Sequence, residues 1–204
     1  TAGHCIGSLR ECQSQRFVLG YQMEADGLAP LTSAQVFSCQ DLVATYDDGA
    51  IDYAFVRLDR APSPMIATPA PVRTLAAPLT LDEPLTLMGF PSGLPLKIDD
   101  GGFVSDPRPE ANDYFLATVD AFGGNSGSGV FNELGEQVGI LVRGERDYIQ
   151  RGPCSVVNEL SLDRGPGDSA EGVTYLHKAL EALCETGYQS EALCGSPVGE
   201  GGLC

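Results

Sequence analysis

The chain has 204 residues, 43% of them hydrophobic and 20% charged, which is ordinary for a globular protein with a substantial core. Its formal net charge is −16, from 28 acidic residues against 12 Lys and Arg. A surface of that sign repels nucleic-acid phosphates and anionic lipids, so we expect neither nucleic acid nor membrane as a partner. The sequence shows no apolar stretch of the ~18 residues that span a bilayer and no visible signal peptide.

Seven cysteines are dispersed along the chain: Cys5, Cys12, Cys39, Cys154, Cys184, Cys194 and Cys204. None forms a CxxC pair, so the sequence predicts no metal site, and we expect no cofactor. Dispersed cysteines predict disulfides in an oxidising compartment, hence a secreted or periplasmic protein. An odd number leaves at least one without a partner in the chain, and the pairing itself is not readable from sequence.

Short apolar runs between glycines and prolines predict strands. They cover residues 17–21, 36–43, 54–58, 85–90, 114–118 and 137–142. The Asp- and Gly-rich segments 47–49 and 99–102 predict turns or loops. Residues 61–84 hold six prolines, which predicts an extended connection between two β units rather than a central strand.

A single helix is predicted over residues 173–184, where Val173, Leu176, Leu180 and Leu183 recur on one face. Glu171 precedes it, where a negative charge suits the helix dipole. His177, within it, is interpreted as a surface or packing residue. Many strands followed by one late helix predict an all-β barrel or sandwich with a C-terminal helix.

The segment 122–129, Phe-Gly-Gly-Asn-Ser-Gly-Ser-Gly, has the composition of a sharp turn that exposes a nucleophile. Glycines at 123, 124 and 127 tolerate the positive φ that such a turn requires, and Ser126 is the candidate nucleophile. Residues 130–131 and 137–142 predict a hairpin directly after it. Taken alone, the segment also fits a plain loop.

A serine nucleophile usually works with a histidine base and a carboxylate that orients it. His4 lies in Thr-Ala-Gly-His-Cys at residues 1–5, and the only other histidine is His177. Asp52 opens the apolar run Asp-Tyr-Ala-Phe-Val-Arg-Leu at 52–58, so burial of its carboxylate requires a partner. The alternative interpretation is a turn aspartate that caps a strand.

Together these three motifs resemble the catalytic-histidine, catalytic-aspartate and nucleophile motifs of trypsin-like serine proteases. They occur in the family's order, 48 and 74 residues apart (52 − 4 and 126 − 52). Residues 124–131 and 139–144 look closest to the bacterial V8-like branch. The resemblance covers residues 1–184 and implies an all-β, two-barrel chymotrypsin-like fold with a C-terminal helix. Residues 185–204, rich in Gly and Cys, are then a tail, interpreted as the start of another small module.

The resemblance also implies a serine endopeptidase acting on protein or peptide substrates through an acyl-enzyme. Ser126 attacks the scissile carbonyl, His4 takes and returns its proton, and Asp52 holds the imidazole. The backbone N–H groups of Gly124 and Ser126 form the oxyanion hole.

Specificity is inferred from four further positions. Asp120 lies six residues before Ser126, where trypsin has the aspartate that binds Arg or Lys, so we predict cleavage after basic residues; the alternative is an aspartate unconnected with substrate. Arg143 and the adjacent Gly144 are also candidate substrate contacts, and Arg143 reaching an acidic side chain is the opposing hypothesis. Glutamyl specificity is disfavoured because Leu141 stands where the V8-like branch has histidine.

Two departures from the family carry expectations. Asn125 replaces the aspartate of the trypsin activation switch, which argues against that switch here. About three strands that precede the family's histidine motif are absent, which implies an N-terminally truncated domain with an incomplete first barrel. Cys5 is then the orphan cysteine, the missing segment is a candidate partner, and the chain alone is expected to be weakly stable.

Three rival interpretations remain. The first is a catalytically inactive, protease-like binding module. The second makes Thr1 an N-terminal nucleophile. The third is an α/β-hydrolase using Ser126, Asp163 or Asp168, and His177; the missing G-x-S-x-G elbow and βαβ pattern argue against it.

Overall fold

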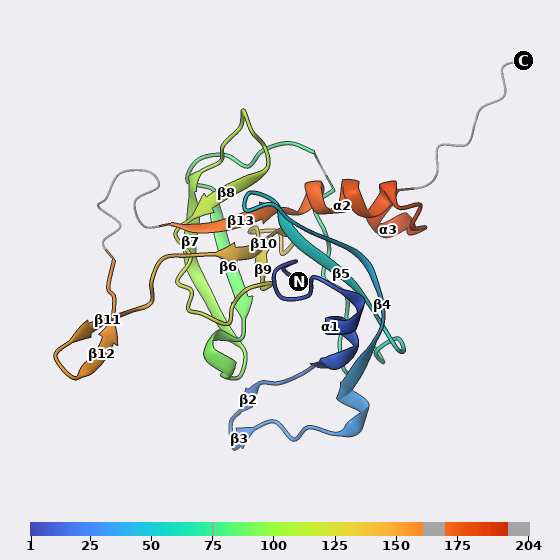
Figure 1. Ribbon diagram of the computed structural model, residues 1–204, viewed down its shortest axis with the longest axis horizontal. Helices are drawn as coiled ribbons and strands as arrows, with labels where there is room; N and C mark the ends of the chain where they lie inside the picture. The colour runs from blue at the N-terminus through green and yellow to red at the C-terminus, as the bar shows by residue number, and fades with distance from the viewer. Residues whose placement is uncertain (75, 161–169, 196–204) are drawn as a thin grey trace, which may run out of the picture.

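A computed structural model describes residues 1–74, 76–160 and 170–195 (Figure 1). Two β units lie side by side, with the segment carrying the N-terminus between them. The fold is mostly β with a C-terminal helix, as predicted. No helix among these residues is long and apolar enough to cross a membrane.

The N-terminal unit is an open antiparallel sheet in the order β1-β4-β5. Its strands are β1 (Arg16–Val18), β4 (Val36–Asp47) and β5 (Asp52–Leu58). The short helix α1 (Leu9–Ser14) packs on β4, and the disulfide Cys12–Cys39 fixes the two together. Two minor strands, β2 (Met23–Glu24) and β3 (Gly27–Leu28), form a small exposed hairpin, and a 3₁₀ turn (Ser33–Gln35) leads into β4.

The C-terminal unit is a closed six-stranded barrel in the order β10-β13-β8-β7-β6-β9. Its strands are β6 (Pro84–Gly89), β7 (Lys97–Asp106), β8 (Tyr114–Ala117), β9 (Gly129–Phe131), β10 (Gln137–Arg143) and β13 (Glu171–Tyr175). Closure leaves the barrel no exposed sheet edge. Phe115, Val130 and Val173 fill its interior, each fully buried.

Helix α2 (Leu176–Glu185) follows β13 directly and packs against both β units. Leu176, Leu180 and Leu183 pack with Tyr53 of β5 and Ile140 of β10 in one apolar cluster. The proline-rich connection holds no strand between β5 and β6 among its described residues, as predicted; a 3₁₀ turn (Pro91–Gly93) follows β6.

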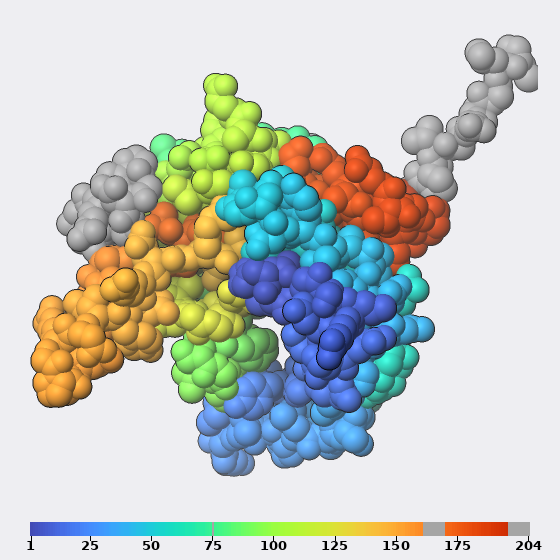
Figure 2. Space-filling model, viewed as in Figure 1, coloured from blue at the N-terminus to red at the C-terminus, as the bar shows by residue number. Residues whose placement is uncertain are grey.

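Two elements lie at the margins. The hairpin of β11 (Tyr148–Arg151) and β12 (Cys154–Val157) projects from the barrel, as Figures 1 and 2 show in orange. Helix α3 (Glu191–Cys194) lies in the tail predicted for residues 185–204. The disulfide Cys184–Cys194 joins it to α2, so this part of the tail is bound to the protease domain predicted for residues 1–184. Residues 196–204 of that tail lie outside the described residues.

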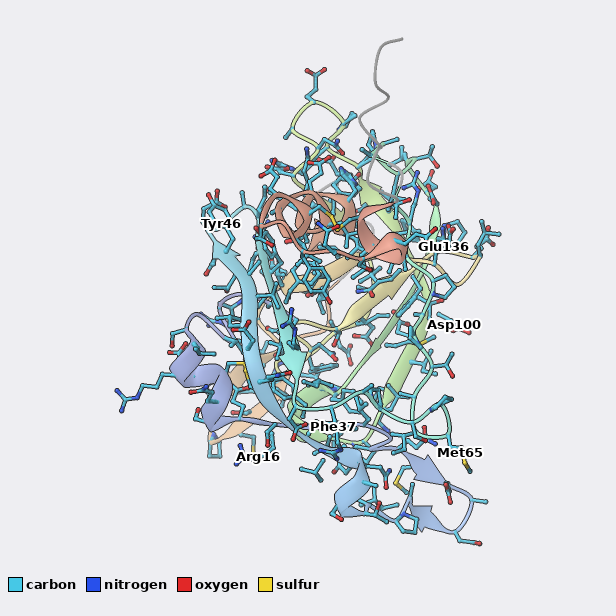
Figure 3. All side chains as sticks on the ribbon, turned by 90° about the vertical axis from the view of Figure 1, so that its right-hand side faces the viewer. Arg16, Phe37, Tyr46, Met65, Asp100 and Glu136 are labelled. Carbon is cyan, nitrogen blue, oxygen red and sulfur yellow. A yellow bond between two sulfur atoms is a disulfide. The ribbon has the colours of Figure 1, made fainter. Side chains whose placement is uncertain are left out.

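Four sequence predictions need correction. The single predicted helix, α2, is accompanied by two short helices, α1 and α3. Helix α2 begins at Leu176, not at residue 173, because Val173 pairs with Leu141 and Phe115 in β13. The strand predicted at 17–21 ends at Val18. Residues 99–102, predicted as a turn, lie within β7, where Leu87 pairs with Asp99 across a bulged register. Asp100 is exposed, and Figure 3 shows it at the outer edge of the molecule, which explains how an acidic segment occupies a strand.

Candidate active site

The carboxylate of Asp52 is paired with the ring of His4. His4 Nδ1 lies 2.5 Å from Asp52 Oδ2, and the other oxygen, Oδ1, accepts the backbone N–H of His4 at 3.1 Å and that of Gly3. The Asp52 side chain is only 6% exposed, against 38% for His4. Both carboxylate oxygens therefore have partners, which is how a buried charge is tolerated at this strand end.

Two neighbouring contacts fix this pair. Ala54 of β5 donates its N–H to Thr1 O at 2.6 Å, so residues 1–4 lie alongside the strand that carries Asp52. Gly3 has no room for a side chain, since a Cβ there would lie 2.8 Å from Tyr53 O. The Asp52 N–H donates to Thr174 Oγ1 of β13 at 3.1 Å, so the aspartate is held from both β units.

Ser126 lies in a tight turn between β8 and β9. Gly124 and Gly127 flank it with φ of 97° and 89°, values that favour glycine, as the sequence predicts. Asn125 is buried, its N–H bonds Phe122 O at 3.1 Å, and the N–H of Gly127 bonds Leu141 O of β10 at 2.7 Å. The hairpin of β9 and β10 that follows is confirmed.

The turn packs against the segment that carries His4. Cys5 Sγ lies 4.0 Å from Ser126 O, and a Cβ added to Gly127 would lie 2.9 Å from Ala2 N. Within the described residues no hydrogen bond joins His4 to Ser126; in unliganded enzymes that bond is often long and tightens with substrate. The three candidate residues thus come from three distant segments that meet at the seam between the units.

Some backbone N–H groups of the turn donate hydrogen bonds within the protein and others do not. Those of Asn125 and Gly127 have the carbonyl partners just given, and that of Gly123 donates to Asp147 Oδ2 at 2.8 Å. In the described part of the chain, the N–H groups of Gly124 and Ser126 have no such partner. These are the two groups that the sequence assigns to an oxyanion hole.

A cavity of about 160 Å³ opens beside Ser126. Its walls come from the turn, from the end of β10 with the residues that follow it, and from Glu171 of β13. The lining includes Leu141, Arg143, Gly144, Glu145 and Asp147. Glu171, Glu145 and Asp147 were not identified from sequence as site residues.

The carboxyl of Glu171 is half-buried in this cavity. A Cβ on Gly144 would lie 2.5 Å from Glu171 Cδ, so the carboxyl occupies the place that a side chain at 144 would take. Burial raises the pKa of Glu171 to about 7, and the negative charges of Asp147, Glu145 and Asp120 act in the same direction. A hydrogen bond from the Glu145 backbone opposes them.

Asp120 and Arg143 are placed differently from each other. Asp120 is exposed, and its N–H donates to Asp99 Oδ2 at 2.7 Å. It borders one cavity of about 430 Å³ that Lys97 also lines and another of about 350 Å³ that Glu171 also lines, but not the cavity of Ser126. Arg143 lines the Ser126 cavity, but its guanidinium donates to Gly49 O at 2.6 Å and Ala50 O at 3.0 Å and lies over the Tyr114 ring.

The remaining histidine lies on α2 and the free thiol of Cys154 on β12, whereas the free thiol of Cys5 directly follows His4. His177 is 4% exposed on α2 and packs against the Tyr175 ring, in agreement with a packing role; burial lowers its pKa. Cys5 and Cys154 are free thiols, half-buried and exposed respectively. Burial, with a smaller effect of Asp52, raises the pKa of Cys5. Asp163 and Asp168 of the hydrolase alternative lie outside the described residues.

Comparison with known proteins identifies the class. Residues 1–140 match the family model of the trypsin-like peptidase domain, and the chain belongs to this family. Its members are proteases, and the closed barrel with a C-terminal helix is the arrangement that the sequence resemblance implied.

Two of the similar solved structures are crystal structures of Rv3671c in an inactive form, one from a point mutant of the M. tuberculosis H37Rv protein and the other described as a protease. The first is 16% identical, with a TM-score of 0.44 over 82% of this chain and 70% of that one. The second is 15% identical, with a TM-score of 0.47 over 76% and 70%. No curated protein matches the chain.

Proposed function

We propose that the chain is a serine endopeptidase in which His4, Asp52 and Ser126 form the catalytic triad. The observation that carries the proposal is the 2.5 Å contact between His4 Nδ1 and the buried Asp52, made beside the turn that presents Ser126. A carboxylate on Nδ1 leaves the other ring nitrogen, Nε2, as the base for a nearby hydroxyl. Membership of the trypsin-like peptidase family supports the same chemistry.

The reaction follows from these positions. Ser126 Oγ attacks the scissile carbonyl carbon as His4 Nε2 takes the hydroxyl proton, and Asp52 stabilises the resulting imidazolium. The N–H groups of Gly124 and Ser126 bind the oxyanion, each contributing roughly 3 kcal/mol to transition-state stabilisation. The proton then passes to the leaving amine, and water hydrolyses the acyl-enzyme by the same steps in reverse order.

Two further assignments accompany this proposal. The segments 124–131 and 139–144 support placement in the bacterial V8-like branch. The disulfides Cys12–Cys39 and Cys184–Cys194 support an oxidising compartment, so we propose a secreted or periplasmic protein acting on protein or peptide substrates.

Labelling with a fluorophosphonate probe tests the triad. The probe should label the wild type, while Ser126→Ala and His4→Ala should abolish labelling. Ser128→Ala, two residues from the proposed nucleophile, is the matched control and should label normally. An unlabelled wild type that melts cooperatively would favour the alternative, a protease-like module that binds peptides without cleaving them.

A further inference from the structure

The cavity beside Ser126 ends at a carboxyl group. Ser126 and Glu171 line the same cavity, and the Glu171 side chain reaches across Gly144, whose missing Cβ makes the room. In a peptidase, the side chain preceding the scissile bond enters the cavity next to the nucleophile, because its carbonyl is the group attacked. A side chain entering here meets Glu171.

The charges around this carboxyl are mostly negative. Glu145 and Asp147 line the same cavity as Glu171, Asp120 lines the adjoining one with it, and the negative charges of all three disfavour ionisation of Glu171. Arg143 is the cation in the cavity lining, and its guanidinium donates to the carbonyls of Gly49 and Ala50. The adjoining cavity, which Glu171 also lines, contains one further cation and one further acid, Arg146 and Glu159.

We propose that Glu171 is the specificity-determining residue of this peptidase and that it binds the ammonium or guanidinium of a Lys or Arg preceding the scissile bond. This inference rests on the proposed function. It assigns the role to Glu171 of β13 in place of Asp120, which is exposed and lines the adjoining cavity together with Glu171 but does not line the cavity of Ser126. A half-buried carboxyl interacts more strongly with a cation than an exposed one, because less water screens it.

The same carboxyl makes the preference depend on pH. Since the pKa of Glu171 is about 7, the group is largely protonated in mildly acidic solution and ionised above neutrality. The ratio of cleavage after Arg to cleavage after Gln should therefore rise as the pH increases from about 6 to 8. An exposed aspartate with an ordinary pKa would be ionised throughout that range and would give a flat ratio.

The experiment compares kcat/KM for peptides that differ only in having Arg, Lys, Gln or Leu before the scissile bond. Glu171→Gln should lower kcat/KM for the Arg and Lys peptides about 10- to 100-fold and leave the Gln and Leu peptides within about threefold. Asp120→Asn should change the Arg peptide far less. Glu133→Gln removes an equal charge from an exposed turn and serves as the matched control.

The outcomes separate the two proposals. If the fluorophosphonate probe labels Ser126 but Glu171→Gln retains the preference for Arg, the role of Glu171 is refuted and the triad stands. Loss of the preference in Asp120→Asn alone would return the role to Asp120. The pH profile of the wild type tests the inference without any variant: an Arg-to-Gln ratio that stays constant between pH 6 and 8 contradicts it. An unlabelled Ser126 overturns both proposals.

Discussion

At the scale of single residues, the site depends on how one buried carboxylate is satisfied. Asp52 accepts bonds from the His4 ring and from two backbone N–H groups, while its own N–H reaches Thr174. Each bond fixes the carboxylate in one orientation, so the imidazole is held by Nδ1 while Nε2 makes no contact with the carboxylate. This pre-organisation is what a base needs in order to act on a hydroxyl.

Asp52→Asn should abolish most of the activity while keeping the fold. An amide is uncharged and can turn its NH₂ group toward Nδ1, so it neither stabilises the imidazolium nor fixes the tautomer, and kcat should fall by about 10⁴-fold. Peptide hydrolysis and circular dichroism, measured on the same samples, check this. Asp100→Asn, which removes an exposed carboxylate from β7, should retain activity within about twofold. Equal losses in both variants would argue against a triad at Asp52.

At the scale of elements, α2 carries a buried titratable group that packs against the Tyr175 ring. Among the described residues, His177 Nε2 has no hydrogen-bond partner, and burial holds the pKa of the ring below its ordinary value of 6.5. The charge of Glu181 opposes this effect, while those of Lys178 and Arg73 reinforce it. Protonation would place a cation at this buried position against the Tyr175 ring.

The folded state therefore favours neutral His177. Its contribution to stability is complete above pH 6.5, the ordinary pKa, and is lost as the pH falls through the lowered pKa of the folded state. Urea unfolding from pH 8 to 5 should show wild type losing stability relative to His177→Phe, which cannot titrate. At pH 8 the variant should be as stable or more so, because it also removes an unpaired polar atom. Parallel pH profiles would contradict this assignment.

The disulfide Cys184–Cys194 closes a ten-residue loop that joins α2 to α3. Restriction of the unfolded chain by a loop of this size contributes about 2–3 kcal/mol to stability. Replacing both cysteines by serine should lower the free energy of unfolding by that amount in urea titrations. Cys154→Ser, at an exposed free thiol on β12, is the control and should leave stability within about 0.5 kcal/mol. A double variant as stable as wild type would show that α3 contributes nothing to α2.

Element assignment from sequence succeeded where local pattern and packing agree. The apolar runs that became β5, β6, β8 and β10 alternate or lie in the core, so their composition reflects their environment. Residues 99–102 became strand because barrel closure pairs them with β6, a long-range effect that outweighs a local preference for turns. The spacing of Val173 from Leu176 matches a helical period by chance. Val173 is part of strand β13 because that strand pairs with β10 on one side and with β8 on the other.

The cavity beside Ser126 was harder to predict than the motifs. His4, Asp52 and Ser126 could be proposed as a triad from sequence because each lies in a short motif with its own chemistry. Glu171 has no such signal: its role in the cavity depends on β13 closing the barrel next to β10, and on the bare backbone of Gly144. From sequence, Glu171 is interpreted as an acidic residue just before a helix, so its position in the cavity beside Ser126 is not predicted.

At the scale of the whole molecule, the net charge of −16 should guide cationic substrates. Raising the ionic strength from about 0.02 to 0.5 M shortens the range of that attraction. We expect kcat/KM for Arg-containing peptides to fall severalfold over this range while neutral peptides of the same length change little. A salt effect equal for both peptide types would mean that the overall charge plays no part in encounter.

The bond from the Asp52 amide to Thr174 Oγ1 has one more consequence. This bond joins the open sheet to the barrel, so the amide proton of Asp52 is protected from solvent exchange only while the two units are packed together. Deuterium uptake at that one amide thus gauges the assembly of the catalytic apparatus separately from the melting of either unit. An inhibitor that bridges the seam would slow this uptake even where the strands themselves gain no protection.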